Sequence, residues 1–206
     1  SPALLACMPS GFQVLEVARP RSDPMSLSTN RGGVCLLFDR QCTVKKIPLP
    51  SYTSFECICT YLKKPGFNSV FTVLYRPGSA SVTNTFFSEL SDLFENLISY
   101  ATSLVIIGDF NIHVDMSDDP HAKRLTDIFL SFGLTQHVCS PTHVRGHTLD
   151  LVITRTDLST QVQPVDPPML SDHSSIVLNI KAQCLQERIE PLLRQTRRWR
   201  SVNENE

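Results

Sequence analysis

Six residues that could perform acid–base or metal chemistry lie at the ends of strongly apolar segments. These residues are Asp109, Asn111, Thr148, Asp150, Asp172 and His173. A carboxylate beside an apolar segment is costly to bury unless it is hydrogen-bonded or paired, and His173 is the natural partner for Asp150. An Asp–His pair fixes the tautomer of the imidazole and raises its basicity, which suits general acid–base catalysis.

Three of these residues are carboxylates. Asp109, Asp150 and Asp172 would repel one another in a single cleft unless a cation lay among them. Mg²⁺ is the expected ion, with Mn²⁺ as an alternative, because it prefers oxygen ligands and keeps part of its bound water. The polar residues together therefore predict a metal-assisted site without an organic cofactor.

The heptapeptide 105–111 leaves two interpretations open. Its β-branched start predicts a strand that is buried on both faces. If the strand continues, alternation places Asp109 and Asn111 on one side and Phe110 on the other. If the strand stops, the same residues form an ordinary Asx turn, since Asp and Asn are common turn residues.

Composition restricts the class of protein. With 206 residues, 41% of them hydrophobic and 19% charged, the chain is long enough for one large globular domain and is not disordered. The formal net charge of -1 excludes a global basic field, so DNA binding would need a local basic patch or metal ions. The seven scattered cysteines include no C-x-x-C pair, which argues against a zinc site or a disulfide framework and favours an intracellular location. No apolar run approaches the roughly 18 residues of a membrane span.

Hydrophobic periodicity predicts an α/β fold in which strands dominate. Strands are expected at 11–17, 34–38, 44–47, 55–62, 69–75, 105–107, 149–154 and 175–180, and helices at 84–100 and 119–133. The strand at 44–47 is expected to pair with the strand at 34–38. Many strands are consecutive, so antiparallel pairing should be common, and a layered α/β sandwich fits better than a doubly wound parallel sheet. A domain at 1–182 is expected to be followed by a polar tail or linker at 183–206, which carries a basic cluster at 194–200.

Six short segments carry a family signature. They are Arg-Gly-Gly-Val at 31–34, Leu-Tyr-Arg-Pro at 74–77, Gly-Asp-Phe-Asn at 108–111, Pro-Thr-His-Val-Arg-Gly-His at 141–147, Thr-Leu-Asp-Leu-Val at 148–152 and Ser-Asp-His-Ser at 171–174. Together they resemble the endonuclease/exonuclease/phosphatase superfamily, and most closely the apurinic-like endonuclease domain of non-LTR retrotransposons. The resemblance implies a four-layer α/β sandwich of two packed mixed or antiparallel sheets flanked by helices. It also implies Mg²⁺-dependent nicking of DNA in the nucleus, which leaves a 3′-hydroxyl that primes reverse transcription, and a reverse transcriptase domain downstream.

Carried over by position, the resemblance implies a role for each catalytic residue. Asp109 would orient or deprotonate the attacking water, or handle the proton of the leaving group. Asn111 would donate to a phosphate oxygen and stabilise the developing charge. His173, held by Asp150, would contact the scissile phosphate.

The metal and substrate contacts follow from the same resemblance. Asp172 would help to bind the metal ion, which acts as a Lewis acid on the phosphate, while Tyr75 and Thr148 would contact the substrate. The superfamily also carries an Asn near its first strand and a metal-binding Glu after it, and Glu16 does not replace that Glu. The chain is therefore expected to be N-terminally truncated, to bind Mg²⁺ weakly and to have little activity.

Two other functions stay open. One is a non-catalytic, domesticated or decaying fragment that binds nucleic acid or protein. The other is a phosphodiesterase of the same fold that acts on lipid or inositol phosphates.

The remaining histidines carry weaker signals. His143 and His147 have the spacing of a helical zinc pair, but Gly146 and the preceding proline argue against a helix. His113 and Asp115 are expected to be solvated loop residues.

Overall fold

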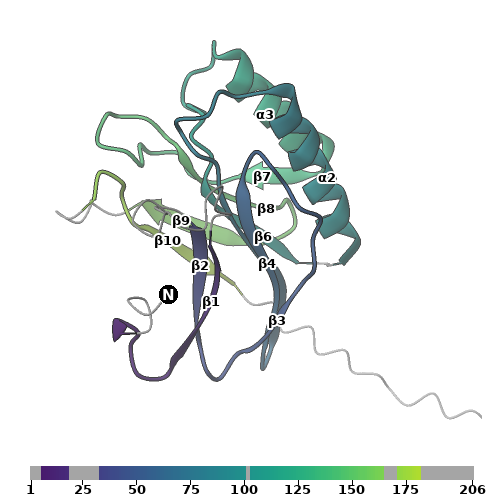
Figure 1. Cartoon of the computed structure of the whole chain (residues 1–206), viewed down its shortest axis with the longest axis vertical. Coiled ribbons are helices and arrows are strands. Elements are labelled where there is room, and N and C mark those ends of the chain that lie inside the picture. The colour runs from purple at the N-terminus through teal and green to yellow at the C-terminus, as the bar shows by residue number, and fades with distance from the viewer. Residues whose placement is uncertain (1–5, 19–32, 101–102, 165–170, 182–206) are drawn as a thin grey trace, which may run out of the picture.

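The structure, a computed structural model, describes residues 6–18, 33–100, 103–164 and 171–181 (Figure 1). Its elements are β1 (Phe12–Ala18), β2 (Gly33–Asp39), β3 (Thr43–Lys46), β4 (Glu56–Lys64), β5 (Phe67–Tyr75), α2 (Asn84–Tyr100), β6 (Leu104–Asp109), α3 (Pro120–Ser131), β7 (Leu134–Gln136), β8 (Asp150–Arg155), β9 (Thr160–Pro164) and β10 (Ile176–Ile180). The segment 31–32 and the expected tail at 183–206, with its basic cluster, lie outside the described residues.

One mixed sheet contains six strands in the order β3-β4-β5-β6-β8-β7. All neighbours in it are antiparallel except β5 and β6, which are parallel and are connected through α2. Two antiparallel ribbons, β1–β2 and β9–β10, form separate sheets. The predicted layered α/β sandwich with frequent antiparallel pairing is confirmed.

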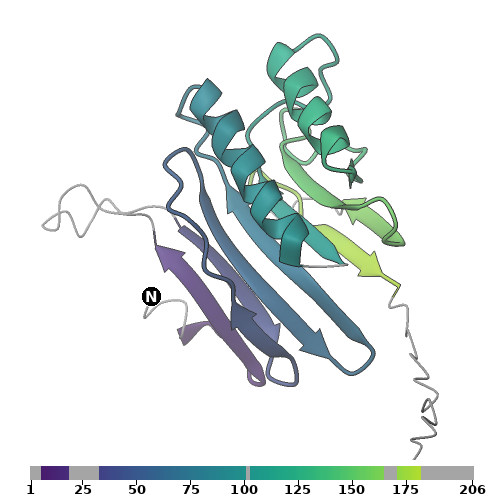
Figure 2. The same cartoon turned by 90° about the vertical axis from the view of Figure 1, so that its right-hand side faces the viewer.

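The helices α2 and α3 cover one face of the six-stranded sheet (Figure 2). The bounds of α2 match the predicted helix, and its apolar stripe packs into the main core. The helix α3 begins after the N-cap Asp119 with Pro120 at its first position, and Gly133 follows its end in a left-handed conformation. Alternate strand residues, such as Leu104 and Ile106 of β6, join the helices in this core. In the described part of the chain, no helix is long and apolar enough to cross a membrane.

The strand β3 has a different partner from the predicted one. It pairs with β4, whereas β2 pairs with β1. Ile47, directly after β3, donates its backbone N–H to the carbonyl of Cys59 and is buried in the main core. Burial of this side chain holds β3 at the edge of the six-stranded sheet. The hydrophobic periodicity of the sequence also does not predict β7 and β9, because β7 is short and β9 is largely polar.

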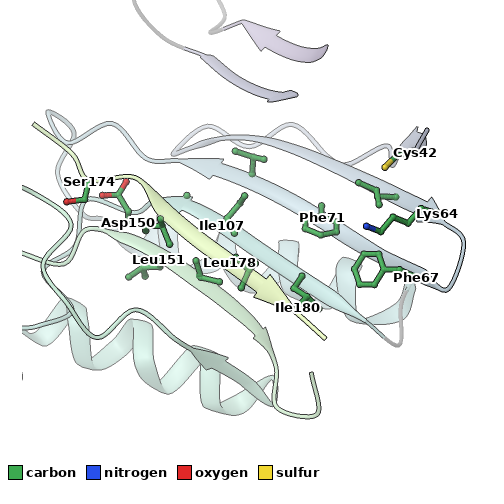
Figure 3. Close-up of a pocket in the computed structure, with 15 residues that line it drawn as sticks. Cys42, Lys64, Phe67, Phe71, Ile107, Asp150, Leu151, Ser174, Leu178 and Ile180 are labelled. Carbon is green, nitrogen blue, oxygen red and sulfur yellow. The ribbon is translucent and has the colours of Figure 1, made fainter. Parts of the chain in front are cut away.

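The face of the sheet opposite the helices carries an apolar groove of about 610 Å³. Figure 3 shows β10 lying over this face, and Leu178, Ile180 and Ile107 are among the residues that line the groove. Asp150 and Ser174 lie together at one end of the groove. The groove therefore ends where the sequence places its candidate catalytic residues.

Candidate active site

Strand register brings three of the predicted residues to one rim of the six-stranded sheet. Tyr75, the last residue of β5, pairs with Asp109 at the end of β6, and Asp109 pairs with Asp150 at the start of β8. Ile107, two residues before Asp109, lines the groove. Since alternate residues of a strand share a face, Asp109 points to the groove side of the sheet and not to the helices.

Gly108 allows this close arrangement of strands. Its φ is 153°, and a Cβ atom there would lie 1.8 Å from the carbonyl oxygen of Leu74 in β5. Any larger residue would therefore push β6 away from β5. The position of Asp109 beside Tyr75 depends on this glycine.

Beyond Asp109 the chain leaves the strand and makes an Asx turn. Oδ1 of Asp109 accepts the backbone N–H of Asn111 at 2.9 Å, and Asn111 has a φ of 49°. The side chain of Asn111 also donates to Oδ2 of Asp109 at 2.7 Å and to the carbonyl of Arg76 at 2.9 Å. Phe110 is fully buried in the main core. The alternative of a continuing strand is wrong, yet the turn still brings the carboxylate and the carboxamide together.

Arg76 is a supporting residue whose role the sequence does not reveal. Only 3% of it is exposed, and its guanidinium donates to the carbonyls of Phe110, Asn111 and Ala80 at 2.7, 2.6 and 2.7 Å. Burial lowers the pKa of Arg76, against the effect of the nearby charge of Asp109. A planar fork of donors suits three converging carbonyls, so Arg76 fixes the backbone of the Asx turn. The signals in the sequence are its place directly after an apolar strand and within the Leu-Tyr-Arg-Pro segment at 74–77.

The predicted Asp–His pair is present in the structure. Nδ1 of His173 lies 2.7 Å from Oδ2 of Asp150. Because a carboxylate only accepts hydrogen bonds, Nδ1 carries the proton, and Nε2 is left for other partners. One ligand atom each from Asp109, Asp150 and His173 lies within 4.8 Å of the others. Residues far apart in the chain therefore meet in one group.

The pKa values report a crowded, partly buried acidic site. Burial raises the pKa of Asp109 to about 6, and the charge of Asp150 adds to this increase, although hydrogen bonds from Asn111 act against it. Burial alone would lower the pKa of His173, but the hydrogen bond and charge of Asp150 outweigh it, so that pKa is raised. Two neighbouring carboxylates with this mutual repulsion fit a divalent cation that prefers oxygen ligands.

Asp172 lies on the other side of His173. Its side chain is 69% exposed, and Oδ2 lies 3.3 Å from Nε2 of His143. Nδ1 of His143 accepts the backbone N–H of Arg145 at 3.2 Å, so Nε2 carries the proton and donates to Asp172. The backbone N–H of Asp172 and this bond from His143 lower the pKa of Asp172. Asp172 thus joins His143 and His173 in a second candidate ligand group, without Asp109.

Tyr75 and Thr148 have different surroundings. Tyr75 is half-buried next to Asp109 in the sheet. Thr148 is buried, and its hydroxyl donates to the carbonyl of Ser140 at 3.0 Å. The Thr148 hydroxyl thus has a partner within its own loop, and its contact with substrate stays a prediction.

Two residues between β6 and α3 that were expected to be solvated, His113 and Asp115, contact the loop between β7 and β8. Asp115 accepts the backbone N–H of Thr148 at 2.9 Å and lies 3.0 Å from Nδ1 of His147. The rings of His113 and His147 stack with centroids 4.0 Å apart. Segment 141–147 is not helical, as Gly146 predicts. Asp115 is an exposed loop residue, as expected, and its carboxylate also anchors the start of the Thr148–Asp150 motif.

Comparison with known sequences gives one family. A profile of the family described as "Endonuclease-reverse transcriptase" matches residues 69–177, which is slightly more than half of the chain. No curated protein sequence matches the chain significantly.

Solved structures share the fold at low sequence identity. The endonuclease domain of TRAS1, a telomere-specific non-LTR retrotransposon, has a TM-score of 0.66 at 16% identity, covering 84% of this chain and 80% of that one. The catalytic domain of human Nocturnin has a TM-score of 0.60 at 22% identity, covering 87% and 75%. The 3′ phosphatase NExo from Neisseria, bound to a product DNA hairpin, has a TM-score of 0.55 at 16% identity, covering 87% and 82%. With its sequence signature, its sandwich fold and the profile match, the chain belongs to the endonuclease–reverse transcriptase family of the endonuclease/exonuclease/phosphatase superfamily.

Proposed function

We propose that the chain is the DNA-nicking endonuclease domain of a non-LTR retrotransposon polyprotein and hydrolyses a phosphodiester bond with the help of a divalent cation. The observation that carries this proposal is the convergence of Asp109, Asp150 and His173 within 4.8 Å. Family membership supports the class of reaction. The likeness to the TRAS1 endonuclease domain supports the fold that holds the site.

The carboxylates of Asp109 and Asp150 would hold the cation, and Asp172, which is grouped with His143 and His173, would have to move toward it to act as a further ligand. When bound, Mg²⁺ or Mn²⁺ supplies Lewis-acid polarisation of a phosphate oxygen. The cation would also relieve the repulsion that raises the pKa of Asp109. Glu16 does not match the principal metal-binding Glu of the superfamily, and we propose weak metal binding and slow turnover for these 206 residues.

Four residues of the chain would bind and activate the water and the phosphate. Asp109, whose pKa is raised to about 6, orients the attacking water or accepts its proton. Asn111 would donate from its carboxamide to a phosphate oxygen as negative charge develops there, in exchange for one of its present bonds to Asp109 and Arg76. His173 carries its proton on Nδ1 toward Asp150, which leaves Nε2 to face the scissile phosphate. Tyr75, next to Asp109 in the sheet, contacts the same phosphate.

The wider context follows from the same proposal. Residues 1–182 would form the nuclease domain, and 183–206 would lead toward a reverse transcriptase domain in the parent polyprotein. The substrate would be duplex DNA at the target site, and the domain would act in the nucleus. The nick would leave the 3′-hydroxyl that primes reverse transcription.

Nicking of supercoiled plasmid under single-turnover conditions tests the function. With Mg²⁺ or Mn²⁺ and excess protein, slow nicking is expected, and chelation of the metal should abolish it. His173→Ala should lower the rate by about 100-fold or more. His121→Ala, a change of an exposed histidine on α3, is the matched control and should nick like the wild type.

Parallel assays separate the alternatives. Metal-dependent nicking that is equal in the wild type and His173→Ala would sink the proposal. Hydrolysis of inositol phosphates without nicking would instead support the lipid or inositol phosphate phosphodiesterase. Salt-sensitive DNA binding without any hydrolysis would support the non-catalytic fragment.

A further inference from the structure

One buried residue outside the predicted site bonds to Asp150 and to Ser174, the residue that follows His173. Thr142 has 0% exposure and lies in the loop between β7 and β8. Its Oγ1 accepts the backbone N–H groups of Leu149 and Asp150, both at 3.0 Å. Its carbonyl accepts the N–H of Ser174 at 2.7 Å. Thr142 therefore bonds to Asp150 through its side chain and to Ser174, which follows His173, through its own carbonyl.

These contacts act at the rim of the six-stranded sheet, where β8 begins. At the start of β8, the hydroxyl of Thr142 holds the peptide N–H of Asp150, which sets the direction of the Asp150 side chain. Residues 171–174 precede β10 and are joined to the loop by the bridge between His143 and His173 and by the bond from Val144 N–H to the carbonyl of Asp172. The loop at 142–144 is thus the common support of two segments that are separated in the sequence by the whole of β8 and β9.

Thr142 is also held in place from its other side. Its backbone N–H donates to the carbonyl of His147 at 3.0 Å. Next to it, the N–H of His143 donates to the same carbonyl at 3.1 Å. The hydroxyl is therefore presented to Leu149 and Asp150 by a closed hairpin-like loop and not by a side chain free to change rotamer.

We propose that Thr142 is a positioning residue that fixes the geometry between Asp150 and His173. This proposal rests on the proposed nuclease function for its catalytic consequence, but its structural consequence can be measured without any turnover. Removing the hydroxyl leaves the N–H groups of Leu149 and Asp150 without their acceptor. The Asp150 carboxylate then shifts relative to Nδ1 of His173, and the imidazole loses its single orientation.

The test compares isosteric and conservative variants of the full chain. Thr142→Val removes the hydroxyl at constant shape, and Thr142→Ser keeps it. Thr60→Val is the matched control, because Thr60 is equally buried. Thr60 lies in β4 of the six-stranded sheet, and its hydroxyl donates to the carbonyl of Phe71 in β5. Long-range ¹H–¹⁵N NMR of the His173 ring, well above its pKa, reports which nitrogen carries the proton.

The wild type, Thr142→Ser and Thr60→Val should each show the Nδ1-protonated tautomer alone, whereas Thr142→Val should show a mixture. In the single-turnover plasmid assay, Thr142→Val should lower the maximal nicking rate by about tenfold or more, with little change in the protein concentration that gives half of this rate, and Thr142→Ser should restore the rate. A single Nδ1 tautomer in Thr142→Val would overturn the proposal. If Thr142→Val does not fold, a mixed tautomer in folded Thr142→Ser would overturn it, and an unchanged one would support it. A wild type with the expected tautomer but no hydrolysis would refute the nuclease function and leave the positioning role intact.

Discussion

At the scale of single residues, the site is characterised by the repulsion between the neighbouring carboxylates of Asp109 and Asp150. Asp150 uses one oxygen for His173, and Asp109 uses both of its oxygens for Asn111. These bonds orient the groups, but burial raises the pKa of Asp109 and the charge of the nearby Asp150 carboxylate raises it further. A structural ion-pair network would neutralise such repulsion internally. In a site arranged to receive a cation, the repulsion between the carboxylates remains.

The Asp150–His173 pair gives a prediction about titration. Asp150→Asn should lower the pKa of His173, because it removes the charge that outweighs the effect of burial. NMR titration of the His173 ring measures this directly, with His121 in the same spectra as the internal control. An unchanged pKa of His173 would show that Asp150 does not hold the imidazole in solution.

The same pair predicts how stability depends on pH. The folded-state pKa of His173 is raised above the ordinary value of 6.5. The pair therefore stabilises the fold fully below pH 6.5, and this contribution is lost as the pH rises through the folded-state pKa. The excess of the wild-type Tm over that of Asp150→Asn should shrink between acidic and alkaline buffers.

At the scale of elements, the position of β6 against β5 decides whether the site exists. Gly108 lets the two parallel strands approach, and the Asx turn after Asp109 is then tied to β5 through Arg76. The loop at 141–149 performs the corresponding task for β8. Both supports consist mainly of bonds to the backbone, so they depend on conformation more than on the identity of neighbouring side chains.

Gly108→Ala tests the first of these supports. A Cβ there would lie 1.8 Å from the carbonyl oxygen of Leu74, and the backbone φ of 153° disfavours side chains. The free energy of unfolding should fall by at least about 3 kcal/mol, as measured by urea denaturation. Gly133→Ala is the control, since φ there is 63° but nothing lies within 4 Å of the added atom, and it should cost only about 1 kcal/mol. Equal losses in both variants would contradict the role of close strand approach.

At the scale of the whole molecule, the two faces of the six-stranded sheet are covered unequally. The helices bury one face in the main core. The other face carries the open groove, and residues of β10 line it while remaining partly exposed. Open apolar surface of this kind binds apolar ligands or promotes association. The candidate site therefore borders a surface that differs in character from the rest of the domain.

The native protein is expected to bind the dye ANS in this groove. Leu178→Lys should reduce the ANS fluorescence, because Leu178 lines the groove. Val177→Lys is the matched control, since Val177 is 44% exposed and is not among the groove-lining residues, and it should leave the fluorescence unchanged. Equal fluorescence in the wild type and both variants would place the dye elsewhere.

The sequence by itself determined most of the element types and the residues that are proposed to carry the chemistry. Periodicity sets the bounds of α2 because burial of one helical stripe is a local property of spacing, and an aspartate beside an apolar strand is costly enough to imply a partner such as His173. Only the tertiary structure decided which strands pair, how the chain turns after Asp109, and which residues support the site. Those outcomes depend on backbone hydrogen bonds between distant segments, and neither the buried Arg76 nor the hydroxyl of Thr142 leaves a hydrophobic pattern along the chain. The burial of side chains leaves a pattern in the local sequence. Strand register and the support of the site arise only when distant segments form hydrogen bonds with the same backbone groups.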